Sequence, residues 1–224
     1  PGEHVGDEEY QRAFLNYAQS VKERISVVFS SYMSGPHKVA FEMNGREISM
    51  WDPFMTDNPL TTRMPTEYLY VNGNEVKIKT FILPHQKKLS SNEFSLYAGA
   101  HGWNAQQGFY IFRNNRLIVE GSWLLNGFEK AEQYRLARIR IDIGNETDSE
   151  WNIDVRKSTA VPPISIQNDI KRIAIAARRA SATIFRNRGK KLARRARNEP
   201  CIVWNKKIRN GQLSYPNHPD QPML

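Results

Sequence analysis

The residues best suited to chemistry in this sequence are basic, and they are concentrated in one segment. Between Ile170 and Asn198 the chain has eleven lysine and arginine residues and no acidic residue. Like charges one helical turn apart weaken a helix by about 0.2–0.5 kcal/mol per pair. Contact with nucleic-acid phosphates would offset that cost, because each neutralised phosphate releases counterions. The eleven residues are Lys171, Arg172, Arg178, Arg179, Arg186, Arg188, Lys190, Lys191, Arg194, Arg195 and Arg197.

We call this stretch the basic segment, and its composition leaves three interpretations open. They are contact with the backbone of duplex DNA, contact with an acidic protein or a neighbouring domain, and an ordinary solvated surface. Phe185 is the single aromatic residue of the segment, which favours duplex backbone contact over stacking of single-stranded bases. Alanines dominate its second half, where a membrane-surface helix would carry bulky apolar residues, so we expect no membrane partner.

Histidine and cysteine give no comparable signal. The five histidines lack the spacing of metal ligands, and Cys201 is the single cysteine, so we expect neither a metal site nor an internal disulfide. A hydrolase built on His85 or His101 would need a nucleophile, a base and an orienting group, and the sequence offers no such set. The 40% hydrophobic content is ordinary for a globular protein, and no signal peptide or membrane span is visible. We therefore expect a cytoplasmic protein.

Hydrophobic spacing predicts two long helices with a β-rich region between them. Apolar residues at spacings of three and four predict a helix over 7–33 and another over 165–196. Alternating residues around asparagine and glycine turns predict hairpins, because these residues tolerate positive φ. The predicted hairpins are 37–43 with 46–51, 68–71 with 75–83, 108–112 with 117–123, and 203–208 with 213–215. Further strands are predicted over 134–143 and 151–155, and a long loop with at most one helical turn over 84–107.

Three segments resemble parts of GHKL-type ATPases. Residues 108–118 (GFYIFRNNRLI) are similar to a strand-turn-strand of MORC-type ATPases and, more distantly, to a strand of MutL. Residues 150–158 (EWNIDVRKS) resemble the strand and loop that deliver a lysine to ATP in the transducer domain of this superfamily. Residues 51–54 (WDPF) and 102–108 (GWNAQQG) resemble patterns of prokaryotic MORC-like proteins. Their order and spacing agree along residues 10–215.

The resemblance implies a transducer domain whose ATP-binding domain lies upstream, as in gyrase B. The ATP-binding signatures of the superfamily are a helix with a catalytic Glu and a metal-binding Asn, a DxGxG motif and a glycine-rich lid, and this sequence has none of them. We therefore expect this chain alone not to hydrolyse ATP, and the intact protein to be an ATP hydrolase with ATP and Mg as cofactors. Pro1 is not a natural start, so we expect the sequence to begin inside a longer product.

Lys157 is the residue that matches the transducer lysine. Phosphoryl transfer spreads negative charge over three oxygens, and a lysine that arrives when two domains close would stabilise that charge. Ser158 beside it is implied as a second nucleotide contact. Asn104, Gln106 and Gln107 are candidates for the interdomain face, and ordinary hydrogen bonding within a loop is the alternative for these three.

The predicted fold is α+β, with a mixed β-sheet layered against long helices. The resemblance adds the GHKL transducer-like arrangement, with its left-handed βαβ crossover. We expect a linking helix (1–35), a transducer-like β-rich core (36–163), a long basic helix (164–198), and a hairpin and tail leading to a possible further domain (199–224). ATP-driven closure, homodimer formation and engagement of duplex DNA would follow, with a role in genome maintenance or phage defence. The alternative is a nucleic-acid-binding module without any nucleotide function.

Overall fold

The computed structural model describes residues 3–152, 159–187, 207–209 and 212–214. The chain divides into two compact units, Pro1–Lys190 and Lys191–Leu224. In the second unit, β9 (Lys207–Arg209) pairs antiparallel with β10 (Gln212–Ser214), which confirms the predicted hairpin as a shorter one.

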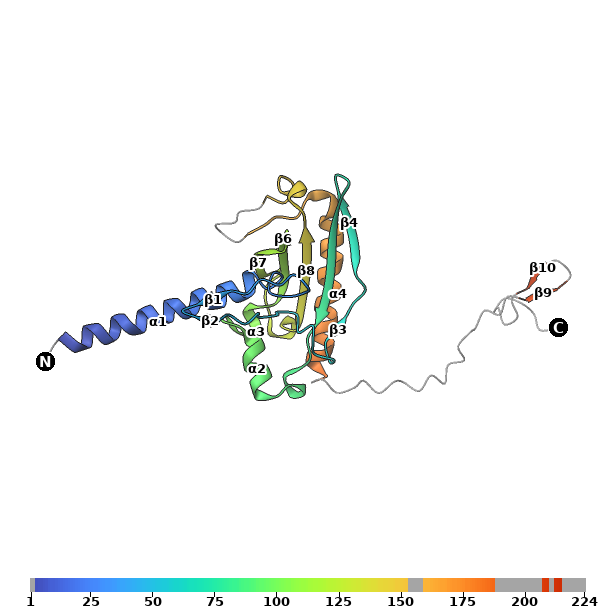
Figure 1. Cartoon of the computed structure of the whole chain (residues 1–224). Helices are drawn as coiled ribbons and strands as arrows, with labels where there is room; N and C mark the ends of the chain where they lie inside the picture. Colours follow the sequence, from blue (N-terminus) through green and yellow to red (C-terminus); the bar gives the residue numbers. More distant parts are fainter. Residues whose placement is uncertain (1–2, 153–158, 188–206, 210–211, 215–224) are drawn as a thin grey trace. The chain divides into compact units, whose positions relative to one another are not determined.

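The first unit is built on one mixed sheet, as predicted (Figure 1). Two antiparallel hairpins, β4–β5 and β6–β7, are joined by β8, which runs antiparallel to β5 and parallel to β6. The short strand β3 pairs with the end of β5, beyond the residues that β4 occupies. The strands are β3 (Thr62–Arg63), β4 (Glu67–Val71), β5 (Asn74–Ile82), β6 (Gly108–Arg113), β7 (Arg116–Ser122) and β8 (Ala137–Ile143).

The hairpin turns form where asparagine and glycine predicted them. Asn72 and Gly73 adopt φ values of 50° and 84°, and Asn114 and Asn115 adopt 44° and 67°. The turn at Asn44 also forms, but its strands, β1 (Glu42–Met43) and β2 (Arg46–Glu47), are much shorter than predicted and lie outside the main sheet. The flanking residues are largely exposed, so no buried face extends these strands.

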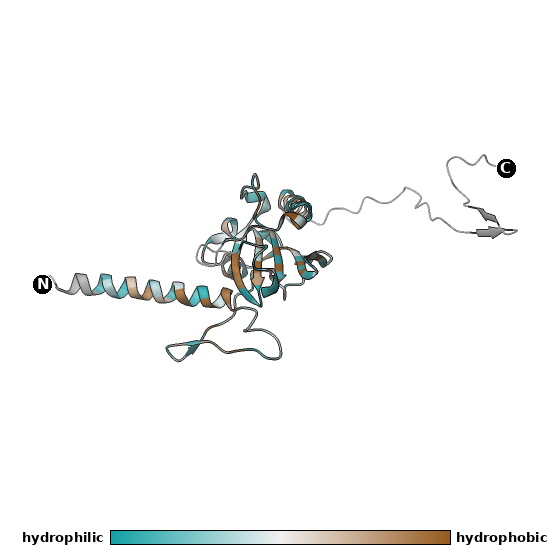
Figure 2. Cartoon of the chain, turned by 90° about the horizontal axis from the view of Figure 1, so that it is seen from above, coloured by the Kyte–Doolittle hydropathy of each residue, from teal (hydrophilic) through white to brown (hydrophobic). Residues whose placement is uncertain are grey.

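Two helices cover opposite faces of the sheet to different extents. α4 (Gln167–Arg186), which follows a 3-10 turn η4 (Ile164–Ile166), buries an apolar stripe against β5 and β8; its buried members include Ile170, Ile173 and Ala177. α1 (Glu3–Val28) packs on the other face through its C-terminal end, where Val27 and Val28 join Tyr110 and Phe112 and Arg24 pairs with Glu120 of β7 at 3.1 Å. The rest of α1 projects away from the sheet (Figure 2).

The region predicted as a loop over 84–107 is largely helical, and that prediction was wrong. It holds a 3-10 turn, η1 (Gln86–Lys88), and two helices, α2 (Ser91–Ala98) and α3 (Gly102–Ala105). The Ser90 hydroxyl accepts a hydrogen bond from the Glu93 N–H at 3.2 Å. The Glu93 carboxylate in turn accepts a hydrogen bond from the Ser90 N–H at 2.8 Å. This capping box starts α2, and Trp103 of α3 stacks on Phe94 of α2 with ring centroids 5.1 Å apart.

Three finer predictions meet the structure only in part. α4 is described to Arg186, and the remainder of the predicted basic helix lies outside the described residues. Of the predicted strand 151–155, Trp151 and Asn152 lie in a turn and the other residues are not described. The parallel neighbours β6 and β8 are connected through β7 and a 3-10 turn, η2 (Glu132–Tyr134), so the described residues contain no βαβ crossover between them. Among these residues, no helix has the length and apolar character needed to cross a membrane.

Candidate functional site

Lys157 and Ser158 lie outside the described residues, but the residues on either side of 153–158 are described. Trp151 is completely buried in the main core. Its carbonyl accepts a hydrogen bond from the Val161 N–H at 2.9 Å, so Trp151 and Val161 lie next to each other. The residues just before it, from a 3-10 turn η3 (Asn145–Thr147) to Glu150, form the stem of this segment.

The β6–β7 turn holds this stem through a charged contact. The Arg113 guanidinium donates hydrogen bonds to the Asp148 carboxylate. Its Nε lies 2.6 Å from Oδ1 and 2.8 Å from Oδ2, and its Nη2 also donates to Oδ2. The hydrogen bonds to Asp148 raise the pKa of Arg113. A two-pronged contact of this kind fixes orientation as well as distance. The stem is therefore tied to the end of β6.

The same turn also contacts the chain just after α1. The Tyr32 hydroxyl donates to the Asn114 carbonyl at 2.6 Å, and the Asn114 N–H donates to the Ile143 carbonyl, at the end of β8, at 3.0 Å. On the β4–β5 side, the Asn72 side chain donates to Glu150 at 2.7 Å. The hydrogen bond from Ser149 and that from Asn72 lower the pKa of Glu150. We call this arrangement of two hairpin turns, stem and α1 end the junction.

The polar side chains of residues 104–107 form hydrogen bonds to other residues of the first unit. Gln107 is fully buried, and its Nε2 donates to the carbonyl and the side-chain oxygen of Asn104, both at 2.8 Å. Its Oε1 accepts from the Trp123 indole N–H and from the Ala131 N–H, both at 3.1 Å. The side-chain oxygen of Gln106 accepts from the Tyr110 hydroxyl at 2.6 Å. The structure thus brings these three residues together around α3.

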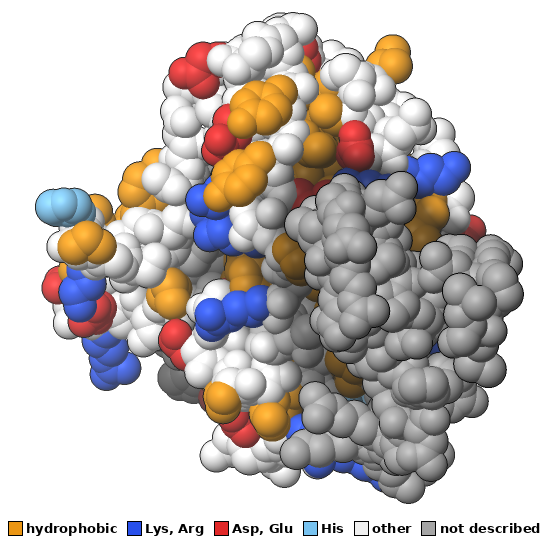
Figure 3. Space-filling model, turned by 90° about the vertical axis from the view of Figure 1, so that its right-hand side faces the viewer, with side chains coloured by type: hydrophobic (Ala, Val, Ile, Leu, Met, Phe, Trp, Pro, Cys, Tyr) orange, Lys and Arg blue, Asp and Glu red, His pale blue; other side chains and the backbone are white. Residues whose placement is uncertain are grey.

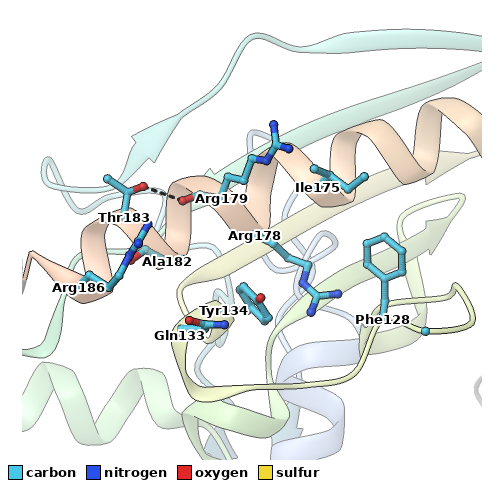
Figure 4. Close-up of a pocket in the computed structure, with 10 residues that line it drawn as sticks. Phe128, Gln133, Tyr134, Ile175, Arg178, Arg179, Ala182, Thr183 and Arg186 are labelled. Carbon is cyan, nitrogen blue, oxygen red and sulfur yellow. Dashed lines mark hydrogen bonds between the residues drawn. The ribbon is translucent and has the colours of Figure 1, made fainter.

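The described part of the basic segment forms one wall of a groove beside α4 (Figure 4). The groove has a volume of about 650 Å³, and no carboxylate of the described residues lines it. Arg178 points from α4 toward Tyr134 and Phe128, with its guanidinium carbon 3.9 Å and 4.8 Å from the two ring centroids. The lining residues are Gly127, Phe128, Gln133, Tyr134, Ile175, Arg178, Arg179, Ala182, Thr183 and Arg186.

The basic residues of α4 have different surroundings. Arg179 and Arg186 line the groove and are exposed, and neither forms a salt bridge to a described residue. Arg172 instead pairs with Glu67 at 2.5 Å and Asp169 at 3.1 Å, and Lys171 lies beside it at the beginning of the helix. The remaining candidates lie outside the described residues; they are Arg188, Lys190, Lys191, Arg194, Arg195 and Arg197.

A buried arginine on β8, Arg138, was missed at the level of sequence. Arg138 is fully buried, and its Nη1 donates to the carbonyls of Arg135 at 2.6 Å and Ala137 at 3.2 Å. Its Nε and Nη2 have no hydrogen-bond partner among the described residues. Burial lowers the pKa of Arg138, and burial together with the Arg138 charge lowers the pKa of Lys130. The alternating pattern places Arg138 on the side opposite α4, but gives no sign that this part of the face is covered.

Comparison of the chain with known protein families, with curated proteins and with solved structures found no match. The described residues also contain no group of three or more histidine, cysteine, aspartate or glutamate side chains that could hold a metal ion.

Proposed function

We propose that this chain is the transducer region of a GHKL-type ATPase, with Lys157 reaching the γ-phosphate of ATP held by an upstream domain. The observation that supports this most is the junction. There Arg113, in the segment 108–118, contacts Asp148, which lies two residues before the segment 150–158. The chain just after α1, the helix that would arrive from the upstream domain, contacts the same turn through Tyr32.

The junction suggests how nucleotide state would be transmitted. The described residues on both sides of the lysine segment are attached to the core, because Trp151 and Ala160 are buried and the Val161 N–H donates to the Trp151 carbonyl. Bound ATP with Mg would supply the phosphoryl group, and both belong to the upstream domain. Lys157 would add positive charge at the γ-phosphate only when the two domains close. A shift of α1 would reach the base of the lysine segment through Tyr32, Asn114 and Arg113.

The direct test is ATP turnover by the polypeptide that contains the ATP-binding domain. We expect Lys157→Ala to lower turnover at least tenfold, about 1.4 kcal/mol of barrier, while the melting temperature stays within a few degrees. Lys88→Ala changes an exposed lysine on η1 and is the matched control, with turnover unchanged. Equal turnover in wild type and Lys157→Ala would contradict the proposal.

A second variant separates the junction from the lysine itself. Arg113→Lys keeps the charge but removes the two-pronged contact with Asp148. The pair is about one-third exposed, so we expect only about 0–1 kcal/mol loss of stability. Turnover should nevertheless fall severalfold at saturating ATP, because the lysine segment is then less firmly supported. An unchanged turnover would show that the junction has no part in the reaction.

The groove beside α4 supports a second candidate, a nucleic-acid-binding module that acts on duplex backbone. Arg178, Arg179 and Arg186 line a groove where phosphates would meet no carboxylate of the described residues. For a labelled duplex, log affinity should fall linearly with log salt, with a slope of about −0.9 per phosphate contacted. The double variant Arg179→Gln/Arg186→Gln should flatten that slope, whereas Arg12→Gln on the projecting part of α1 should not. A salt-independent affinity would exclude this function.

A further inference from the structure

The face of the sheet opposite α4 is covered over only part of its width. Phe54, Phe81, Tyr110 and Phe112 pack there with the last turn of α1. On the β4 side of the same face, Tyr68 is 48% exposed and Tyr70 is 61% exposed. The covered and uncovered halves therefore share one sheet surface.

The register places basic residues beside the two tyrosines. Tyr68 lies directly opposite Lys77 of β5, and Lys79 lies directly opposite Arg140 of β8. Directly opposed residues point to the same face, and residues two apart along a strand do so too. Tyr68, Tyr70, Lys77, Lys79 and Arg140 thus form one surface, which we call the open sheet face. Viewed from the side of β4 and α4, hydrophobic side chains lie beside lysine and arginine side chains (Figure 3).

The charges of the open sheet face favour an anionic partner. The Lys77 ammonium lies 5.6 Å from the centre of the Tyr68 ring, and neither Lys77 nor Lys79 forms a salt bridge to a described residue. Arg140 is held by Asp142 at 2.7 Å, so that carboxylate is already neutralised. Glu75, opposite Tyr70, is the one further carboxylate that the register of the described strands places on this face. Two lysines therefore remain available next to two exposed rings.

Exposed aromatic rings next to lysines on a sheet suit one class of ligand in particular. Single-stranded nucleic acid presents unstacked bases, which stack on aromatic side chains, and phosphates, which attract lysines. Duplex DNA keeps its bases stacked and would leave both rings unused. We propose that the open sheet face binds single-stranded nucleic acid, with bases on Tyr68 and Tyr70 and phosphates on Lys77 and Lys79. None of these four residues lines the groove beside α4.

The test uses fluorescence anisotropy with a labelled oligothymidylate of about 15 nucleotides, against a duplex of equal length. Loss of one stacked base corresponds to roughly fivefold or more in affinity. We therefore expect Tyr68→Ala/Tyr70→Ala to weaken binding of the single strand at least about tenfold. Tyr68→Phe/Tyr70→Phe should retain the affinity, because the rings remain. Lys77→Gln/Lys79→Gln should reduce the salt slope by about 0.7 for each phosphate that the variant no longer neutralises.

The matched control is Tyr10→Ala/Tyr17→Ala on α1, where the rings are 81% and 69% exposed but lie away from the sheet. It should leave the affinity unchanged. Equal affinity of the Tyr68→Ala/Tyr70→Ala variant and wild type would overturn the proposal, and so would an equal fall in affinity in the control. If the Tyr68→Ala/Tyr70→Ala variant instead abolished self-association in sedimentation, the face would join two copies of the chain, and the proposal would fail.

Discussion

At the scale of single residues, Arg138 is the most unusual side chain of the described chain. It is completely buried, and two of its three guanidinium nitrogens have no hydrogen-bond partner among the described residues. Burial lowers its pKa, and the neighbouring Tyr110 offsets part of that shift. A buried charge without a full set of acceptors costs stability, and an apolar side chain of similar volume often does better. An unbranched apolar residue would therefore fill this site at least as well.

Arg138→Met should leave the free energy of unfolding unchanged or raise it, by up to about 4 kcal/mol. Arg138→Ala should be less stable than Arg138→Met by about 2–5 kcal/mol, because it adds a cavity. Urea unfolding of the three proteins measures both differences. A marked loss of stability in Arg138→Met would show that a water or anion satisfies the guanidinium in solution.

At the scale of elements, the β6–β7 hairpin allows a clean test of backbone geometry. Gly108, the first residue of β6, has a φ of 106°, and a Cβ built there would lie 2.6 Å from the Ser122 carbonyl oxygen. Gly35 has a φ of 85° and no atom within 4 Å of such a Cβ. Both alanine variants incur about 1–2 kcal/mol of backbone strain. Gly108→Ala should lose at least about 1 kcal/mol more, because neither strand can move without breaking the pairing of Phe109 with Ser122.

Chemical unfolding of the two alanine variants compares these costs directly. Equal losses of stability in Gly108→Ala and Gly35→Ala would mean that the hairpin yields without strain, and that the close approach of β6 to Ser122 is not rigid.

The capping box of α2 makes a prediction about pH. Hydrogen bonds from the Ser90 backbone and hydroxyl lower the pKa of Glu93 below its ordinary value of 4.5. A carboxylate whose pKa is lowered on folding stabilises the fold above its unfolded pKa, and this contribution is lost as pH falls through the folded value. The stability difference between wild type and Glu93→Gln should therefore be constant near neutral pH and shrink below pH 4.5. Unfolding measured across this range would contradict the idea if the difference did not change.

The elements also show which features were predictable. The hairpin turns were predictable because Asn72-Gly73 and Asn114-Asn115 adopt positive φ, which few other residues do. The two hairpins that contain these turns were therefore predicted correctly. α2 and α3 were missed because eight and four residues carry too little periodicity, although the Ser90–Glu93 spacing was a readable capping signal. The strands around Asn44 were overpredicted, because alternation alone does not supply a sheet to pack against.

The candidate site was predictable in its segments but not in its contacts. The resemblance selected residues 108–118 and 150–158, yet the link between Arg113 and Asp148 spans 35 positions and has no local pattern. The open sheet face depends on the pairing of β5 with β8, which joins residues far apart in the chain. Such pairings depend on the tertiary fold, so no sequence period reveals them.

At the scale of the whole molecule, positive charge is distributed unequally between the two compact units. Residues 191–224 contain seven lysine or arginine residues and two acidic ones, a net charge of +5 out of the total of +9. The described buried cores, by contrast, consist entirely of residues from the first unit, up to Ala182. Removing the second unit therefore changes the charge of the protein while leaving the described core intact.

A variant that ends at Lys190 would test the effect of the charge of the second unit separately from the stability of the core. Its thermal unfolding midpoint should stay within a few degrees of that of the full chain, because every residue of the sheet and its two cores remains. If the basic segment contacts duplex DNA, the salt slope should fall by up to about 3.6, since Lys191, Arg194, Arg195 and Arg197 are removed. The affinity for the single strand should fall only by the non-specific electrostatic contribution of the removed charges. It should still depend on Tyr68 and Tyr70. An unchanged duplex slope would confine duplex binding to α4, whereas a large fall in the midpoint would show that the second unit supports the fold of the first.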